Sequence, residues 1–468
     1  MTNLILPSNS ITSSGISPLI TTALNFMGAS DNARFSRTNA SSGNSTQATL
    51  SCWLKYQGRL SQSLNIFMAP DSAGDSRFYI NFTSSETVGG THRYPDRDFS
   101  STYTDRHIDC ANWYHVVARI NTSESTAGDR LKIYVNNRQI DLTVASGGLG
   151  SGNNIGFNAS GYKNIFGYND VSNDGVGNLA DCYFAEVIKC DGQLYLPTDF
   201  AEYDSTSGQW IPKDDLESSL TFGTTGYYYD FANSSDLGND ISGNNNDATI
   251  SNCTQSLDTP SNSFATMNHL DRFYGQQLTW SKGNRKIVAS SSSHAWTSRF
   301  ALSTFPMFAG VWYAEFKVLN EGASNQFYVG VIKDVNGLNF DSSLGYISGG
   351  NGYGYYANAG QIVNNGSDLS SGASYTANDI IGVKLDLDSN TLDFYKNGSH
   401  QGSQVTGLSG TMWHFAVNGY QNFEVECNFG NPPYTISSAN QDPNEFGSFE
   451  YDTQSGYACC TANLATEG

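Results

Sequence analysis

Two carboxylates on one short segment are the residues of this chain that come nearest to a catalytic pair. Glu424 and Glu426 in the run FEVECNF alternate along an expected strand, so both side chains point to the same face. Enzymes that hydrolyse glycosidic bonds with retention place two carboxyl groups about 5–5.5 Å apart. No third acidic residue follows this pair, and the two could equally be polar residues on a solvated face. The chain holds no E-x-D-x-E or E-x-D-x-x-E run, so we expect no enzymatic activity.

Nucleophilic and metal-dependent catalysis find no support in the spacing of the other reactive residues. The chain has no G-x-S-x-G turn, which would present a nucleophilic serine. It also has no H-x-x-x-H or H-E-x-x-H spacing and no C-x-x-C pair, the usual signals of a zinc site. His115 follows Tyr114 in an expected strand, and we interpret it as a structural residue.

Two loops rich in oxygen-bearing side chains are candidates for calcium binding. The first, YNDVSNDGVGN, offers Asp170, Asn173 and Asp174 within a few residues. Calcium takes 6–8 oxygen ligands, which such loops can supply, although neither loop has the EF-hand spacing. Asp and Asn also make turns without any metal, and this alternative is favoured for both loops. The second loop, DLGNDISGNNND, offers Asp236, Asp240, Asn244 and Asp247.

Several aromatic residues lie where a sugar-binding site could use them. Aromatic faces pack against the apolar side of a pyranose ring, while neighbouring polar groups bond its hydroxyls. The candidates are Trp296 in SSHAWTSRF, Tyr353 and Tyr356 in GYGYYAN, and Tyr420 in VNGYQNF. The alternative is that alternating aromatics belong to the core. In GYGYYAN, Tyr353 and Tyr355 share one face of the expected strand, and Tyr356 points the other way.

The elements that position these residues recur about 265 residues apart. ANWYHVVARI followed by DRLKIYVNNRQI predicts two strands and a tight turn at Asn136-Asn137. ANDIIGVKLDLDSNTLDFYKNGSHQG predicts the same arrangement, with its turn at Asn397-Gly398. A second motif also occurs twice, as YFAEVIKC and WYAEFKVL. The repetition predicts an all-β chain of two tandem, antiparallel, jelly-roll-like sandwiches.

Changes in composition divide the chain into four segments. Residues 1–20 are polar and rich in Ser and Thr, and we expect an arm or attachment segment. Residues 21–265 form the first sandwich and 266–440 the second, because the polar stretch DTPSNSF separates them. Residues 441–468 are expected to form an irregular C-terminal extension.

Charge and hydropathy exclude several classes of function. The formal net charge of −20 repels phosphate backbones, which argues against nucleic-acid binding. No apolar stretch approaches the roughly 20 residues of a membrane span. The N-terminus, MTNLILPSNSITSSG, does not resemble a signal peptide. Of the eight cysteines, Cys459 and Cys460 are adjacent, and two free thiols are the favoured interpretation over a vicinal disulfide.

The second sandwich resembles a SPRY domain. The motifs that carry the resemblance are VWYAEFKV, FYVGVIKD, DIIGVKLDLDSNTLDFYKNGSHQG and NFGNPPY. The first sandwich resembles laminin-G or concanavalin-A-like domains through SCWLKY, NWYHVVARI, LKIYVNNRQ and LADCYFAEVIKCDGQ. Both resemblances imply β-sandwiches that bind other molecules.

The joining stretch and the order of domains resemble an arrangement found in bacteriophage virion proteins. This resemblance implies a non-enzymatic protein on the particle surface, made in the host cytoplasm, such as a tail fibre that adheres to host glycans. The N-terminal arm would attach it to other virion proteins. The alternative is a structural decoration or joining protein that binds only virion proteins. The sequence leaves the oligomeric state open, with a homo-oligomer as one alternative.

Overall fold

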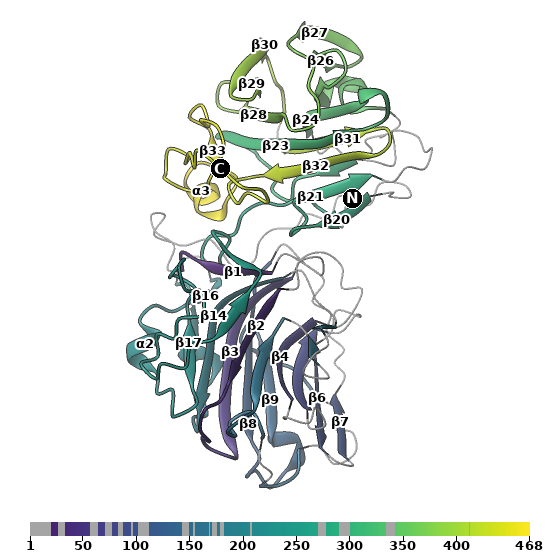
Figure 1. The fold of residues 1–468 in the computed structure, drawn as a ribbon. Coiled ribbons are helices and arrows are strands. Elements are labelled where there is room, and N and C mark those ends of the chain that lie inside the picture. Colours follow the sequence, from purple (N-terminus) through teal and green to yellow (C-terminus); the bar gives the residue numbers. More distant parts are fainter. Residues whose placement is uncertain are drawn as a thin grey trace. The chain divides into compact units, whose positions relative to one another are not determined.

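The computed structural model divides into two compact units (Figure 1). We call the described part up to Asn262 the first unit and the part from Ser263 onward the second unit. None of the helices in the described ranges is long and apolar enough to cross a membrane. Apart from Ile20, the expected N-terminal arm lies outside the described residues. The structure describes residues 20–26, 33–56, 64–70, 77–82, 88–94, 97–101, 112–142, 149–152, 155–167, 169–170, 176–177, 182–205, 208–269, 278–289, 300–333, 342–410 and 412–468.

The first unit contains two large sheets whose neighbouring strands pair antiparallel. The eight-stranded sheet runs in the order β10 (Arg138–Gln139), β9 (Leu131–Val135), β8 (Tyr114–Asn121), β3 (Gln47–Tyr56), β14 (Cys182–Asp191), β1 (Ala23–Phe26), β19 (Cys253–Ser256), with β17 (Tyr227–Tyr229) beside β14. The seven-stranded sheet runs β18 (Thr249–Ser251), β2 (Arg34–Thr38), β11 (Lys163–Phe166), β4 (Leu64–Pro70), β5 (Arg77–Phe82), β6 (Val88–Tyr94), β7 (Arg97–Ser101).

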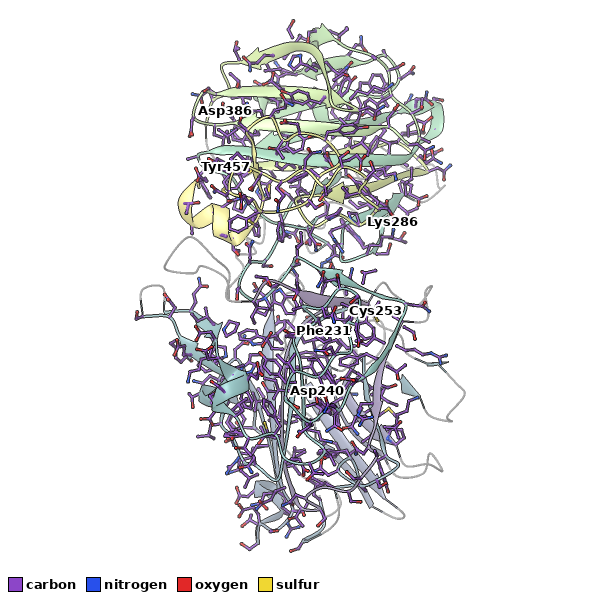
Figure 2. The ribbon with its side chains drawn as sticks, turned by 60° about the vertical axis from the view of Figure 1, so that its left-hand side comes forward. Phe231, Asp240, Cys253, Lys286, Asp386 and Tyr457 are labelled. Carbon is purple, nitrogen blue, oxygen red and sulfur yellow. The ribbon has the colours of Figure 1, made fainter. Side chains whose placement is uncertain are left out.

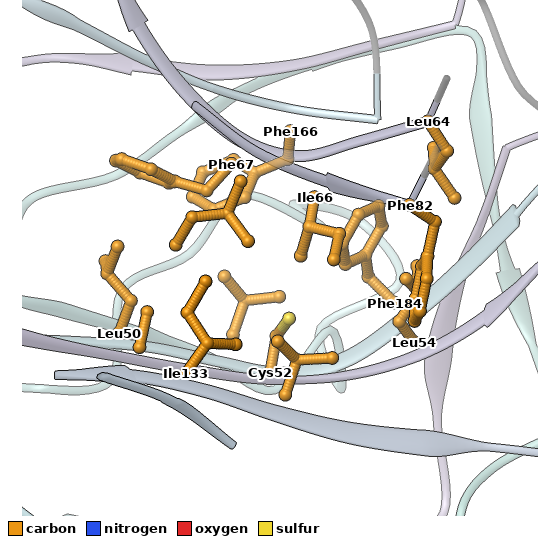
Figure 3. Close-up of a cluster of buried hydrophobic side chains, with 14 of the residues drawn as sticks. Leu50, Cys52, Leu54, Leu64, Ile66, Phe67, Phe82, Ile133, Phe166 and Phe184 are labelled. Carbon is orange, nitrogen blue, oxygen red and sulfur yellow. The ribbon is translucent and has the colours of Figure 1, made fainter. Parts of the chain in front are cut away.

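The core of the first unit lies between these sheets because alternate residues of each strand point inward. In β3, the expected inward set of Leu50, Cys52, Leu54 and Tyr56 belongs to the main core cluster, whereas Trp53 packs on the other side of the sheet. Figure 3 shows side chains from β3 and β9 facing those from β4 and β11 across the core.

Short elements cover the outer side of the eight-stranded sheet, so both of its faces are buried. Val117 and Ile188 of the sheet pack there against Phe200, Leu216 and other apolar residues of the covering segment. The covering elements are α1 (Pro197–Phe200), β15 (Ala201–Tyr203), β16 (Trp210–Pro212) and α2 (Leu216–Ser219). The remaining elements of the unit are η1 (Ala127–Asp129), β12 (Asn169–Asp170) and β13 (Val176–Gly177).

Strand β14 contains a bulge at which its pairing with β3 shifts between Ala185 and Ile188. Glu186 lies in this bulge with a φ of 49°, a left-handed conformation that is uncommon for residues other than glycine. Its side chain is 6% exposed and accepts a hydrogen bond from the hydroxyl of Tyr228. The bulge therefore places a buried carboxyl group against the covering layer.

The second unit is also a sandwich of two sheets. The eight-stranded sheet runs β20 (Leu278–Ser281), β21 (Lys286–Ala289), β32 (Phe423–Asn428), β23 (Val311–Glu321), β28 (Ile380–Asp386), β29 (Thr391–Lys396), β30 (Ser399–Thr406), with β33 (Tyr457–Ala458) beside β23. The six-stranded sheet runs β22 (Phe300–Leu302), β31 (Trp413–Gly419), β24 (Phe327–Lys333), β25 (Gly352–Tyr356), β26 (Gln361–Asn364), β27 (Ser367–Ser371). The helical elements among its described residues are η3 (Ala323–Asn325), η4 (Leu344–Tyr346), η5 (Ser348–Gly350) and α3 (Thr461–Thr466).

The strands of the second unit follow the expected alternation. In β28, Ile381, Val383 and Leu385 lie in the main core cluster, and the turn at Asn397-Gly398 has positive φ at both residues, as a tight hairpin requires. Apart from the parallel pair of β23 and β33, the named strands of this unit pair antiparallel. The expected all-β fold of antiparallel sandwiches is confirmed.

Two buried carboxylates hold residues 441–468 in place, one on β23 of the second unit and one within the segment itself. Glu315 on β23 accepts hydrogen bonds from the backbone N–H groups of Glu450 and Tyr451, at 3.0 and 2.8 Å. Asp442 accepts bonds from the N–H of Ala458 and from the side-chain amide of Asn463. Burial raises the pKa of both carboxyls, while these bonds oppose that rise. The segment expected to be an irregular extension therefore carries β33 and α3 and completes the second unit.

Candidate functional site: the tyrosine face of the second unit

The outer side of the six-stranded sheet carries three tyrosines, which we call the tyrosine face: Tyr328, Tyr346 and Tyr356. In β24, Phe327 and Val329 point into the core, so Tyr328 between them points outward. Tyr356 ends β25 directly opposite Tyr328 in the register of the two strands. Tyr346 comes from η4, a short turn that packs over the same sheet.

The three rings of the tyrosine face differ in exposure, and two of them stack on each other. We call the stacked pair of Tyr328 and Tyr356 the tyrosine floor. Tyr328 and Tyr356 stack with ring centroids 4.5 Å apart and an interplanar angle of 12°. Tyr328 is 4% exposed, Tyr356 is half-buried and Tyr346 is 47% exposed. Gly354 makes room for the floor, because a Cβ atom there would lie only 2.8 Å from Cδ1 of Tyr328. The arrangement holds one ring in place and leaves two ring edges open to a ligand.

Polar groups surround these rings. Burial raises the pKa of Tyr328, and a hydrogen bond with Ser343 partly opposes this, so the phenol stays protonated at neutral pH. Asp368 on β27 accepts a hydrogen bond from the side-chain amide of Gln361 at 2.5 Å and also acts on the ionisation of Tyr328. The N–H of Leu344 donates to Oδ1 of the buried Asn418 at 3.2 Å, which fixes η4 to the sheet.

This combination suits binding. Stacked tyrosines give flat apolar area at a low cost in side-chain entropy, and their hydroxyls and the nearby carboxylate can bond a polar ligand. The tyrosine face can therefore accept an apolar or aromatic side chain, a proline or the apolar side of a sugar ring. The negative charge of Asp368 favours ligands with amide, hydroxyl or cationic groups.

The aromatic residues singled out in the sequence do not gather at one place. Tyr356 belongs to the tyrosine face, whereas Tyr353 lies on the inner side of β25 and packs against Trp413 with ring centroids 5.9 Å apart. Tyr420 follows the end of β31, where its N–H donates to the carbonyl of Gln326, and it is not part of the tyrosine face. Trp296 lies outside the described residues.

Two members of the tyrosine face were missed in the sequence. Tyr328 follows Phe327 in FYVGVIK and interrupts the alternation by placing an aromatic residue on the side away from the core. This is a readable signal, since an outward aromatic in a strand needs a partner. Tyr346 gives no such signal, because it lies in an irregular stretch whose position depends on contacts distant in the sequence.

The calcium candidates are only partly described. Asp170 ends β12, of which the structure describes the backbone alone, and Asn173 and Asp174 lie outside the described residues. In the second oxygen-rich loop, the polar side chains form hydrogen bonds with the backbone of the loop and of neighbouring residues. Asp240, labelled in Figure 2, accepts bonds from the N–H groups of Tyr228, Ser242 and Asn246, as favoured by the turn interpretation. Within the described ranges, no group of three or more His, Cys, Asp and Glu side chains could hold a metal ion.

The residues that came nearest to catalysis have structural partners. Glu424 pairs with Lys286 at 2.5 Å, and Glu426 pairs with Lys282 at 2.7 Å, so both carboxylates are neutralised by a lysine. The interpretation of the pair as polar residues on a solvated face fits Glu424, whose side chain is 30% exposed, but is wrong for Glu426, which is buried. Cys459 and Cys460 are buried thiols and do not form a vicinal disulfide, as favoured from the sequence.

Ser51 and His115 form a buried pair whose hydrogen bonds run in the wrong direction for catalysis. The indole N–H of Trp210 donates to Nδ1 of His115 at 3.1 Å. An indole nitrogen can only donate, so Nε2 carries the proton of the neutral ring and donates to Oγ of Ser51 at 2.8 Å. Burial lowers the pKa of His115 to about 3. The imidazole therefore positions the serine and the indole and has no lone pair to activate the hydroxyl.

Comparison with known proteins finds a match to one protein family within the second unit. Residues 311–432 match the model of the SPRY domain. Ran-binding protein 9 of Xenopus laevis is 27% identical over 165 residues, which are 34% of this chain and 29% of that protein. Ran-binding protein 10 of Danio rerio is 27% identical over 137 residues, which are 29% of this chain and 22% of that protein. The chain thus spans less than a third of the length of these relatives.

Solved structures are similar at lower identity. The SPRY domain of human HERC1 is 19% identical, covers 34% of this chain and 96% of its own, and gives a TM-score of 0.29. A heptameric pentraxin from Limulus polyphemus is 15% identical, covers 38% of this chain and 80% of its own, and gives a TM-score of 0.30. The matched range runs from β23 to β32 and contains the whole tyrosine face. Residues 311–432 of this chain are therefore a SPRY domain.

Proposed function

We propose that this chain is a non-enzymatic binding protein whose SPRY domain holds a segment of a partner protein on the tyrosine face. SPRY domains mediate protein–protein interactions, and the match to that family contains Tyr328, Tyr346 and Tyr356. The observation that carries the proposal is the stacked pair of Tyr328 and Tyr356 beside the exposed Tyr346. Aromatic residues dominate the energetics of protein interfaces, which makes this place the strongest candidate for a binding hot spot.

The kind of partner follows from the shape and charge of the tyrosine face. The tyrosine rings offer apolar area, and the groups near them include hydroxyls, the amide of Gln361 and the carboxylate of Asp368. An extended segment with an aromatic or proline anchor next to a basic or amide side chain would meet both features. The relatives are named for binding Ran, and we extend to this chain only the wider proposal of a protein partner.

A second function is supported by the same rings. Half-exposed tyrosines next to a carboxylate and an amide also suit the apolar face and hydroxyls of a sugar. This supports adhesion to a surface glycan by a virion protein of a bacteriophage, such as a tail fibre. The resemblance of the first unit to laminin-G or concanavalin-A-like sandwiches favours this setting. A decoration protein that binds only virion proteins would use the tyrosine face for a protein partner, in line with the first proposal.

One experiment separates the two partners. The purified chain is immobilised and exposed to a displayed library of random peptides and, in a separate arm, to bacterial surface polysaccharides. Tyr346→Ala and Tyr356→Ala remove the exposed rings, while Tyr203→Ala is the matched control because its ring is 58% exposed on the first unit. Enriched peptides that depend on Tyr346 and Tyr356 would support the protein partner. Polysaccharide binding with the same dependence would support adhesion, and binding that ignores both tyrosines would contradict either use of this face.

A further inference from the structure

A buried lysine lies in the interior of the first unit and faces a buried asparagine. Lys189 on β14 points inward beside Val187 and is 0% exposed. Its Nζ atom lies 3.1 Å from Oδ1 of Asn164 and 3.1 Å from the carbonyl oxygen of Phe157. Among the described residues, Nζ has no ion-pair partner within 4.0 Å, and the rings of Phe157 and Tyr227 flank it at 5.6 and 5.3 Å. An ammonium group is expensive to bury in such surroundings.

The amide of Asn164 is held in an orientation that polarises its carbonyl. Asn164 is 0% exposed on β11, in the sheet opposite β14. Its Oδ1 atom accepts a hydrogen bond from the hydroxyl of Tyr227 at 3.2 Å in addition to the bond from Lys189. Its Nδ2 atom donates to the carbonyl of Phe157 at 3.2 Å. Nζ of Lys189 and Nδ2 of Asn164 therefore share the carbonyl oxygen of Phe157 as an acceptor, which holds the amine next to the amide.

The protonation states of both partners favour reaction. Burial lowers the pKa of Lys189 to about 7, with Arg37 lowering it further and Asp191 opposing the shift. A large fraction of the amine is therefore uncharged and nucleophilic near neutral pH. Burial raises the pKa of Tyr227 well above its ordinary value, so its hydroxyl remains a hydrogen-bond donor over the same range.

We propose that Lys189 and Asn164 join in an intramolecular isopeptide bond. The neutral amine attacks Cγ of Asn164, and the Tyr227 hydroxyl stabilises the charge that develops on Oδ1. The bond from Nζ to Cγ forms and the bond from Cγ to Nδ2 breaks. A proton from the amine passes to Nδ2, which leaves as ammonia, so the reaction needs no oxidant and no further reactant. Both side chains are 0% exposed, which limits the access of bulk water to the carbonyl.

The bond would connect the two sheets of the sandwich. Lys189 belongs to the eight-stranded sheet and Asn164 to the seven-stranded sheet, 25 residues apart in the sequence. A covalent link there would close a loop through the core and prevent the layers from separating. This inference is independent of the proposed binding function, because it concerns the first unit alone.

The test is the mass of the protein. We expect the intact chain to be lighter than its sequence by one ammonia molecule, and a tryptic digest to contain a branched peptide joining Lys189 to Asn164. Lys189→Met and Asn164→Ala should both abolish the branched peptide. Lys163→Met, which replaces the lysine next to Asn164 on β11, is the control and should retain it.

A time course separates a chemical role of the tyrosine from a structural one. Tyr227→Phe should fold and slow the appearance of the branched peptide, by about tenfold or more, because one oxyanion donor is lost. In the unsubstituted chain the rate should rise with pH through 7 as the amine loses its proton. If the unsubstituted chain keeps its full sequence mass after prolonged incubation at about pH 9, the pair is a hydrogen bond only and the proposal is overturned.

Discussion

Tyr328 and Tyr356 stack in parallel on the outer side of the six-stranded sheet, with ring centroids 4.5 Å apart. The register of β24 and β25 places them directly opposite each other. Cross-strand aromatic pairs of this kind stabilise a sheet by roughly 0.2–1 kcal/mol. The same pair belongs to the proposed binding face, so that fold and proposed function depend on one contact.

Gly354 is the residue that gives the tyrosine floor its space. We expect Gly354→Ala to destabilise the second unit by about 1–3 kcal/mol, because its new Cβ would clash with the Tyr328 ring. Urea denaturation of the variant would measure this. Adding Tyr328→Leu should recover part of the loss, since a smaller side chain relieves the clash. Equal losses in the single and double variants would show that the clash is not the cause.

Glu315 holds the C-terminal segment in place. Its carboxylate accepts bonds from two backbone N–H groups, from Asn428 and from Tyr434. Glu315→Gln replaces one accepting oxygen by an NH2 group, which cannot accept the hydrogen bonds that this oxygen accepts. We therefore expect a loss of about 2–4 kcal/mol in the free energy of unfolding. Glu321→Gln on the same strand is the control, because that carboxylate lies in an exposed contact with the N–H of Ala377. A control that lost as much as Glu315→Gln would contradict this account.

Glu186 makes the stability of the first unit depend on pH. Burial raises its pKa from 4.5 to about 7, with the hydrogen bond from Tyr228 opposing and Asp230 adding to the rise. Between these values the folded state binds more protons than the unfolded state, so this group's contribution to stability is lost as pH rises. We expect Glu186→Gln to gain stability relative to the unsubstituted chain over this window, by up to about 3 kcal/mol.

The measurement for Glu186 is a pair of unfolding curves at each pH. The difference between variant and unsubstituted chain isolates Glu186 from His115, whose lowered pKa makes stability rise with pH between about 3 and 6.5. A difference that does not change from pH 4.5 to pH 7 would contradict the buried, proton-binding carboxyl.

The sequence predicted the strands of the two sandwiches better than the segments that pack over their sheets. Alternation in TLSCWLKY identified the inward face of β3, because a strand buried on one side repeats every second residue. The same rule could not predict the C-terminal segment. It is held by carboxylate bonds from Glu315 to backbone 135 and 136 residues away, which leave no periodic pattern. Of the three members of the tyrosine face, only Tyr356 was singled out in the sequence, whereas the position of Tyr346 depends on contacts distant in the sequence.

The most direct test of the account is the affinity of one library-selected peptide for the chain and for its Tyr346→Ala, Tyr356→Ala double variant, measured by calorimetric titration. We expect the double variant to bind at least about tenfold more weakly, because truncating a hot-spot aromatic costs about 2 kcal/mol or more. Tyr203→Ala should bind like the unsubstituted chain. Equal affinity of the double variant and the unsubstituted chain would contradict the claim that the tyrosine face is the binding site.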